Sequence, residues 1–160
     1  MITVLAVFAL AGQEKGARAA TTTYRNVRFA YGIEVPAALR LRSQISGGVG
    51  RLYASGDGEI TLRVSAAPTL VGVGGRATRS LKAAAQRTFD IGSKPGASVS
   101  VLTKPNEIET SYWTNDRNVI TRTIKLETGF ATVEIRIPSS RGDAATKSFV
   151  RSMRSLRPLS

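Results

Sequence analysis

The sequence of 160 residues contains no cysteine and no histidine. These absences exclude disulfides, zinc sites built from cysteine and histidine, Ser-His-Asp triads and Cys-His dyads. Catalysis would have to use carboxylates, lysine, tyrosine or a serine–lysine pair. Ser80 and Lys82 lack the Ser-x-x-Lys spacing of serine–lysine acyl enzymes, and no other nucleophile–base pair stands out. The sequence therefore favours a non-catalytic protein that needs no cofactor.

Acidic residues are scarce. The chain has 11 of them against 23 lysines and arginines, which gives a net charge of +12 and an isoelectric point near 11.1. Such an excess predicts anionic partners, namely nucleic acid, phospholipid, lipopolysaccharide or an acidic polymer. A basic surface that only keeps the protein soluble is the alternative, because net charge describes association and not fold.

The N-terminal segment has the pattern of a secretory signal peptide without its basic beginning. Residues 2–11 are apolar except for one threonine, a run too short for a transmembrane helix but typical of a signal-peptide core. Ala17-Arg18-Ala19 predicts cleavage after Ala19 or Ala20, and Ala9-Leu10-Ala11 is a second candidate site. Loss of residues 1–19 would remove Glu14, Lys15 and Arg18 and leave a charge of +11. We expect a periplasmic or secreted domain over residues 20–160, with no transmembrane segment.

The sequence after the signal-like segment predicts strands, one helix, four more strands and a final helix. Alternating apolar residues predict strands over 29–36, 98–103, 108–114, 119–127 and 130–137. Residues 51–66 read as a hairpin that turns at Gly56-Asp57-Gly58 and has one half-wet arm. The segment 21–26 reads as an exposed lead-in, and residues 37–49 are ambiguous. This order predicts an α+β domain with one antiparallel sheet at its centre.

Two helices follow from the spacing of apolar residues. The first is predicted over 77–90, with an apolar face of Leu81, Ala84, Ala85, Thr88 and Phe89. The second is predicted over about 143–156, with Asp143 as its N-cap. Its apolar face would comprise Phe149, Val150, Met153 and Leu156.

The stretch YRNVRFAYGIEVP resembles the opening of the PsbP-like family, whose members include small exported bacterial proteins. Tyr24, Asn26, Phe29, Tyr31 and Pro36 fit the family pattern, with Ala30 in place of the usual glycine. The Ser148-Phe149 pair of the terminal helix and the order of elements over residues 24–158 are also similar.

The resemblance implies an α/β/α sandwich around an antiparallel sheet. Members of the family are largely non-catalytic: the photosynthetic ones assist assembly of the oxygen-evolving complex, and fold relatives bind a GTPase. Metal-linked roles in the family often involve histidine. This chain has none, so no metal role is carried over.

Two groups of basic residues are candidates for an anionic partner. Arg76 and Arg79 lie close after the glycine-rich stretch 72–75, which precedes the first helix and whose backbone amides can hold a phosphate. A flexible loop is the alternative for this stretch. Lys147, Arg151 and Arg154 line the polar side of the terminal helix, opposite its apolar face. Docking of that helix on the sheet would leave this stripe exposed.

Paired carboxylates are the remaining candidates for chemistry. Glu107 and Glu109 share one face of a strand with Trp113, as a carboxylate-dependent hydrolase with a sugar-stacking tryptophan would require. The alternative is a solvated face with basic residues on the next strand. Asp57 and Glu59 are too few for a calcium loop and read as a turn.

Three functional hypotheses result. The first is an exported, non-catalytic binding or assembly accessory domain that binds an anionic envelope component or an acidic protein. The second is a hydrolase of an envelope polymer that uses Glu107 and Glu109. The third is a cytoplasmic nucleic-acid binder in which residues 1–19 belong to the fold; export would exclude it.

Overall fold

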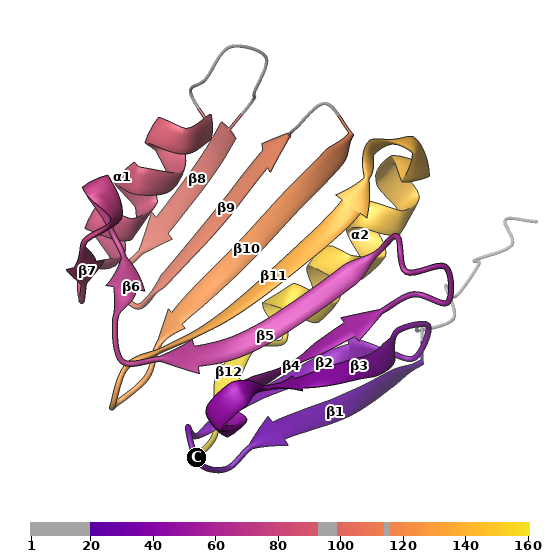
Figure 1. Cartoon of the computed structure of the whole chain (residues 1–160), viewed down its shortest axis with the longest axis horizontal. Helices are drawn as coiled ribbons and strands as arrows, with labels where there is room; N and C mark the ends of the chain where they lie inside the picture. Colours follow the sequence, from indigo (N-terminus) through magenta and orange to yellow (C-terminus); the bar gives the residue numbers. More distant parts are fainter. Residues whose placement is uncertain (1–19, 93–98, 114–115) are drawn as a thin grey trace, which may run out of the picture.

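A computed structural model describes residues 20–92, 99–113 and 116–160 of the chain (Figure 1). The predicted signal segment therefore lies outside the described residues. Most of the described chain is antiparallel strand, and two α-helices of more than one turn pack against the strands. The predicted α+β class, with two main helices on an antiparallel sheet, is confirmed.

The main sheet has seven antiparallel strands in the order β3-β4-β5-β11-β10-β9-β8. Four of the predicted strands and both arms of the predicted hairpin belong to it. The hairpin turns at Gly58, which has a φ of 76°. The bounds are β3 Arg40–Ile45, β4 Gly50–Ala54, β5 Thr61–Ala67, β8 Val99–Lys104, β9 Glu107–Trp113, β10 Arg117–Lys125 and β11 Phe130–Pro138.

A separate three-stranded sheet corrects the prediction of a single sheet. β2 (Tyr31–Pro36) pairs with β1 (Thr21–Asn26) on one side and with β12 (Arg157–Pro158) on the other. The predicted lead-in 21–26 is thus a strand, and the chain's C-terminal end returns to pair with its first hairpin. The alternation along β2 was read correctly, but alternation alone does not reveal a strand's partners.

The residues that carry the family resemblance hold this small sheet to the main one. The Asn26 amide donates hydrogen bonds to the Tyr24 hydroxyl (3.1 Å) and to the Gly48 carbonyl (2.9 Å). The Tyr31 hydroxyl donates to the Val49 carbonyl (2.8 Å), and burial raises the pKa of that hydroxyl. Ala30, which replaces the family's glycine, has a φ of 51°. These positions therefore serve the fold.

The segment 37–49, ambiguous in sequence, forms β3 and a short 3-10 turn over Ser46–Gly48. β3 is an edge strand and nearly all of it is exposed, so neither alternation nor an apolar run marks it. Its Arg40 and Arg42 are the charged residues that protect sheet edges from further pairing.

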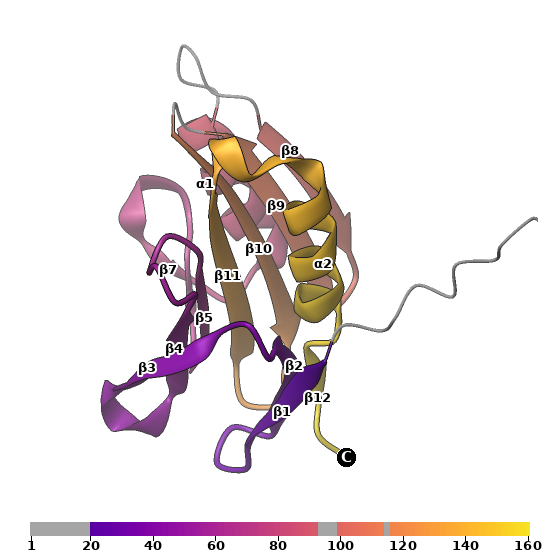
Figure 2. The ribbon, with the colours of Figure 1, turned by 90° about the vertical axis from the view of Figure 1, so that its right-hand side faces the viewer.

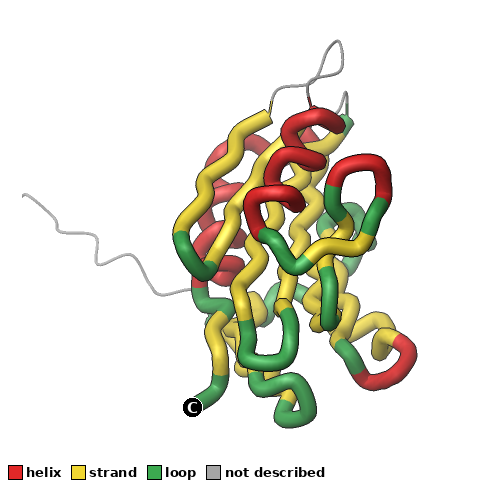
Figure 3. The backbone as a smooth tube through the Cα atoms, turned by 90° about the vertical axis from the view of Figure 1, so that its left-hand side faces the viewer, coloured by secondary structure: helices red, strands yellow, loops and turns green. Residues whose placement is uncertain are grey.

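The two helices lie against opposite faces of the main sheet (Figures 2 and 3). α1 (Leu81–Gly92) packs through Leu81 and Ala85 on Ile108 and Phe130. α2 (Gly142–Arg154) packs through Phe149 and Met153 on the other face, as detailed below. On the α1 face, Arg63 of β5 stays exposed, in agreement with the half-wet arm. Two-residue strands β6 (Leu70–Val71) and β7 (Ala77–Thr78) flank a 3-10 turn over Val73–Gly75 beside α1.

The helix boundaries differ from those predicted. α1 begins at Leu81 because residues 77–78 pair with β6 and Ser80 caps the helix: its hydroxyl accepts from the amide of Ala83 (3.2 Å). Phe89, predicted on the buried face, is half exposed. α2 begins at Gly142 and its N-cap is Arg141, so the prediction of Asp143 as N-cap is wrong. It ends at Arg154, two residues earlier than predicted.

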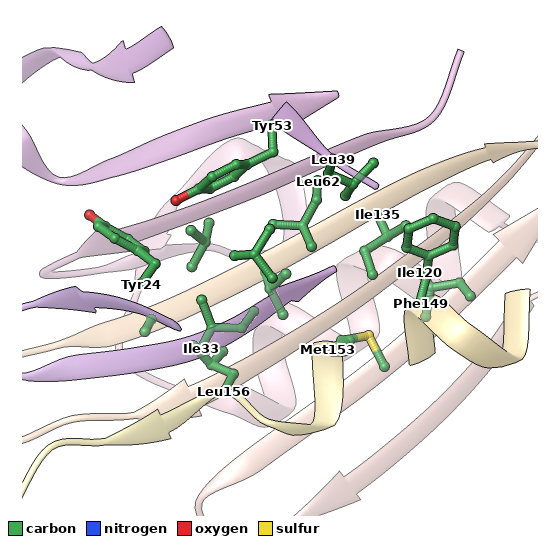
Figure 4. Packing of buried hydrophobic residues seen from close by; sticks show 14 of the residues in the cluster. Tyr24, Ile33, Leu39, Tyr53, Leu62, Ile120, Ile135, Phe149, Met153 and Leu156 are labelled. Atoms are coloured by element: carbon green, nitrogen blue, oxygen red, sulfur yellow. The ribbon is translucent and has the colours of Figure 1, made fainter. Parts of the chain in front are cut away.

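The main hydrophobic core lies between the α2 face of the main sheet, the small sheet and α2 (Figure 4). Met153 and Leu156 are almost fully buried there, and Phe149 is buried beside them. Ser152 and Ser155 bond to the backbone of Glu34 in β2, which fixes the helix against the small sheet. The terminal segment is therefore a docking helix. The core contains Tyr24, Tyr31, Ile33, Val35, Tyr53, Leu62, Val64, Ile120, Ile124, Val133, Ile135, Ile137, Phe149, Met153 and Leu156.

Candidate functional site

The predicted stripe on the terminal helix is exposed. Lys147, Arg151 and Arg154 lie on the side of α2 that faces away from Phe149 and Met153. Arg154 Nη2 lies 3.2 Å from Glu109 Oε1 of β9, so its charge is partly neutralised. Lys147 and Arg151 have no side-chain partner among the described residues. The stripe thus offers two unpaired cations and a third that already pairs with a carboxylate.

The glycine-rich stretch 72–75 forms a 3-10 turn between two short strands. Two of its four amides are used within the loop: Gly75 donates to the Gly72 carbonyl (3.1 Å), and Gly72 donates to the Arg76 carbonyl (2.7 Å). The strand β7 and the cap Ser80 also separate this loop from the first turn of α1. These contacts favour the loop as the interpretation of this stretch, and a phosphate site there stays a prediction.

Arg76 and Arg79 are exposed on the α1 side of the molecule. Arg79 borders a hollow with Leu81 of α1 and Phe130, both of which belong to the cluster under α1. The stripe of α2 lies over the opposite face of the sheet. The structure therefore does not bring the two predicted basic groups together.

Glu107 and Glu109 share the α2 face of β9, as the alternation predicted, but each pairs with a cation. Glu107 accepts from Lys104, and its Oε2 lies 2.5 Å from Arg122 Nη2 of β10. These hydrogen bonds, that of Lys104 first, hold the pKa of the Glu107 carboxyl below its ordinary value. A general acid at neutral pH needs a raised pKa. Glu107 therefore has the contacts of a structural ion pair and lacks the raised pKa that a general acid needs.

Arg122 is the residue at this site that sequence reasoning missed. Besides Glu107, its Nη1 donates to the carbonyls of Arg154 (2.5 Å), Leu156 (3.2 Å) and Met153 (3.4 Å). A cation there donates to carbonyls at and just beyond the end of α2, where the helix dipole also favours a positive charge. The sequence did contain a signal for this role. Arg122 alternates along β10 with the same parity as Ile120 and Ile124, so its side chain lies on the face of the strand that carries these apolar residues.

The acidic hairpin tip is also ion-paired. Asp57 and Glu59 both contact Arg141, which precedes α2; the Glu59 contact measures 2.8 Å. The Ser55 hydroxyl and the Glu59 amide, with Arg141, lower the pKa of the Asp57 carboxyl. Among the described residues, no three acidic side chains gather as a metal site. The reading of this tip as a turn, not a calcium loop, agrees with these contacts.

The pairing of Glu107 predicts an acid-dependent loss of stability. A carboxyl whose pKa is lowered in the folded state stabilises the fold above its unfolded pKa, and that contribution is lost as pH falls. We expect wild type to be more stable than Glu107→Gln at pH 7, by about 1 kcal/mol. The difference should shrink below the ordinary pKa of 4.5. Urea unfolding from neutral to acidic pH measures it, and a constant difference would contradict the assignment.

Comparison with solved structures places the fold. The solution structure of cyanobacterial PsbP (CyanoP) from Synechocystis sp. PCC 6803 aligns over 93% of this chain and 98% of its own, with a TM-score of 0.57 and 12% identity. The chain has a PsbP-like fold. The Ran-binding protein Mog1p of Saccharomyces cerevisiae shares it, with a TM-score of 0.53 and 12% identity over 88% of this chain and 96% of that one. The PsbP-like fold predicted from the sequence is confirmed.

Other comparisons add no family assignment. No family model matches the chain, and no curated protein matches its sequence. At 12% identity the two solved structures establish the PsbP-like fold alone. Within the described residues, neither helix is long and apolar enough to cross a membrane.

Proposed function

We propose that this chain is an exported, non-catalytic binding or assembly accessory domain. Its basic surface binds an acidic protein partner or an anionic component of the cell envelope. The observation that carries the proposal is the distribution of charge. The acidic residues that were candidates for catalysis or metal binding are held in ion pairs. By contrast, the exposed side chains of Arg76, Arg79, Lys147 and Arg151 have no partner among the described residues.

The PsbP-like fold supports a binding role. One solved structure with this fold is a Ran-binding protein, so the fold can serve protein recognition. The signal-like beginning of the sequence supports export, and the basic surface would then meet envelope components rather than nucleic acid. The full α/β/α sandwich is likewise part of the proposal, because α1 covers only part of its face of the sheet.

A salt titration tests the binding role with purified protein. We expect the domain to bind immobilised poly-glutamate, lipopolysaccharide or phosphatidylglycerol vesicles in about 0.01 M salt. Binding to at least one of these probes should weaken at least about tenfold at about 0.15 M salt, because exposed charges are then screened. An affinity that does not change with salt would contradict a charge-based surface. Lack of binding to all three would count against the proposal as well.

The intact mass of the protein from its own cell tests export. A mature N-terminus near Thr21 supports the exported domain and excludes the nucleic-acid alternative. A retained Met1 would overturn the export part of the proposal.

A further inference from the structure

Apart from the stripe on α2, the strongest feature of the surface is a groove at one end of the main sheet. Three adjoining hollows of about 650, 290 and 400 Å³ have Lys125 in common among their lining residues. Their lining residues come largely from the β8–β9 and β10–β11 turns and the start of α1, which lie at the same end of the sheet (Figure 1). The 400 Å³ hollow lies on the α1 face, and the 650 Å³ hollow lies on the α2 face beside Arg122. We refer to the three hollows together as the Lys125 groove.

Cations from separate elements border the Lys125 groove. Arg79 and Lys82 border its α1 end, Lys125 borders every hollow, and Arg157 borders the α2 end. None of these four has a side-chain partner among the described residues. Two further cations of the lining, Lys104 and Arg122, are both bonded to Glu107. The exposed carboxylate of Glu127 is the acidic group not engaged in such a pair, so the groove carries an excess of positive charge.

The lining between these cations is largely apolar. Ile124, Leu126, Leu156 and two prolines contribute to the 650 Å³ hollow, a volume within the usual range of ligand sites. None of the lining residues is among the exposed large apolar side chains of the described chain, so nothing projects as a membrane anchor would. The groove also turns from one face of the sheet to the other, which a flat bilayer cannot follow.

Nucleic acid fits this groove less well than a peptide does. Proteins that bind single strands stack bases on exposed aromatic rings. The aromatic residue in the lining is Phe130, which is 3% exposed and packs under α1. A flexible chain with carboxylates for the cations and apolar side chains for the lining complements the groove in both charge and polarity.

We propose that the Lys125 groove binds an extended acidic peptide segment of a partner protein, with an apolar residue of that segment in the hollow beside Ile124 and Leu156. This inference rests on the proposed binding function and assigns it a place distinct from the α2 stripe. Carboxylates of the peptide pair with Arg79, Lys82, Lys125 and Arg157. The apolar residue supplies affinity that salt does not remove.

Fluorescence anisotropy with a labelled peptide tests the proposal. The probe carries glutamates and aspartates around a central leucine. We expect Arg79→Glu/Lys125→Glu to weaken its binding at least about tenfold, equivalent to about 1.4 kcal/mol. The matched control, Lys147→Glu/Arg151→Glu, should weaken it less than about threefold. Each reversal removes two charges, so both double variants fall from +12 to +8. Unfolding curves check that both variants fold.

Two further measurements keep the test independent of those variants. Replacing the leucine of the probe by serine should weaken binding several-fold, because apolar burial is lost. Amide chemical shifts of the wild type should change most at residues 104–106 and 124–130 on addition of the probe.

Specific outcomes overturn the inference. Equal loss in both double variants would mean that only net charge attracts the peptide, and larger loss in the α2 variant would place the site on the stripe. Either result leaves the proposed binding function intact. Preferential binding of phosphatidylglycerol vesicles or single-stranded DNA through Arg79 and Lys125 would replace the peptide as ligand. If the probe does not bind at all, the proposal of a peptide site in the groove is wrong. The salt titration described above tests the general binding function separately.

Discussion

Gly50→Ala is expected to destabilise the domain by more than about 3 kcal/mol or to prevent folding, at the upper end of the cost of overpacking. Gly50 begins β4, in the middle of the β3–β4–β5 part of the main sheet. A Cβ atom at this position would lie 1.9 Å from the Val64 carbonyl oxygen and 2.7 Å from the Ser65 Cα. Both atoms belong to the backbone of β5, so no side-chain rotation relieves the clash. Relief requires β4 to separate from β5 or to shift register.

Gly56→Ala is the matched control for this prediction. Gly56 lies in the turn of the same hairpin, and a Cβ added there meets no atom within 4 Å. We expect its effect to stay within about 1 kcal/mol and to be stabilising if the backbone suits alanine. Urea unfolding of both variants measures the difference. A Gly50→Ala protein as stable as Gly56→Ala would show that β4 does not approach β5 this closely.

Arg122→Met is expected to lower the free energy of unfolding by about 2–4 kcal/mol. The side chain is 15% exposed. Its loss leaves Glu107 without one of its two cations and removes the donor to the Arg154 and Leu156 carbonyls, at and just beyond the end of α2. Breaking one partner of a buried ion pair costs about 3–5 kcal/mol, and the partial exposure of this pair reduces that figure. Lys104 remains as a partner for Glu107 and limits the loss further.

A double variant separates the two roles of Arg122. In Arg122→Met/Glu107→Met the unpaired carboxylate is gone, so we expect part of the lost stability to return. The stability that does not return measures the hydrogen bonds from Arg122 to the carbonyls of Arg154 and Leu156. Arg63→Met, on the exposed part of the α1 face, serves as control and should change stability by less than about 0.5 kcal/mol. An Arg122→Met variant with the stability of that control would contradict the assignment.

The sequence predicted those parts of the fold that depend on local patterns. Alternation located β5, β9, β10 and β11 because one side of each strand faces a core. Helical spacing identified Met153 and Leu156 as buried and Lys147 and Arg151 as exposed, as the structure confirms. Resemblance at Tyr24, Asn26 and Tyr31 led to the PsbP-like fold.

What the sequence did not reveal depends on pairing between distant segments. The return of Arg157 and Pro158 to β2 adds the third strand of the small sheet, and no local pattern encodes that partner. The exposed edge strand β3 lacks a buried side and so lacks a pattern. The sequence pointed to Arg79 because it lies near the glycine-rich stretch. Lys82, Lys125 and Arg157 are distant in sequence from one another and reach the same groove only when the turns of the sheet come together.

A crosslinked pull-down from the envelope fraction of the source cell tests the central claim most directly. The tagged wild-type domain is compared with Arg79→Glu/Lys125→Glu and with Lys147→Glu/Arg151→Glu at low and physiological salt. We predict that wild type captures an acidic envelope protein or an anionic envelope component, that more salt reduces the yield, and that at least one reversal removes it. Recovery of the same material by all three proteins at both salt concentrations would contradict a binding function for the basic surface.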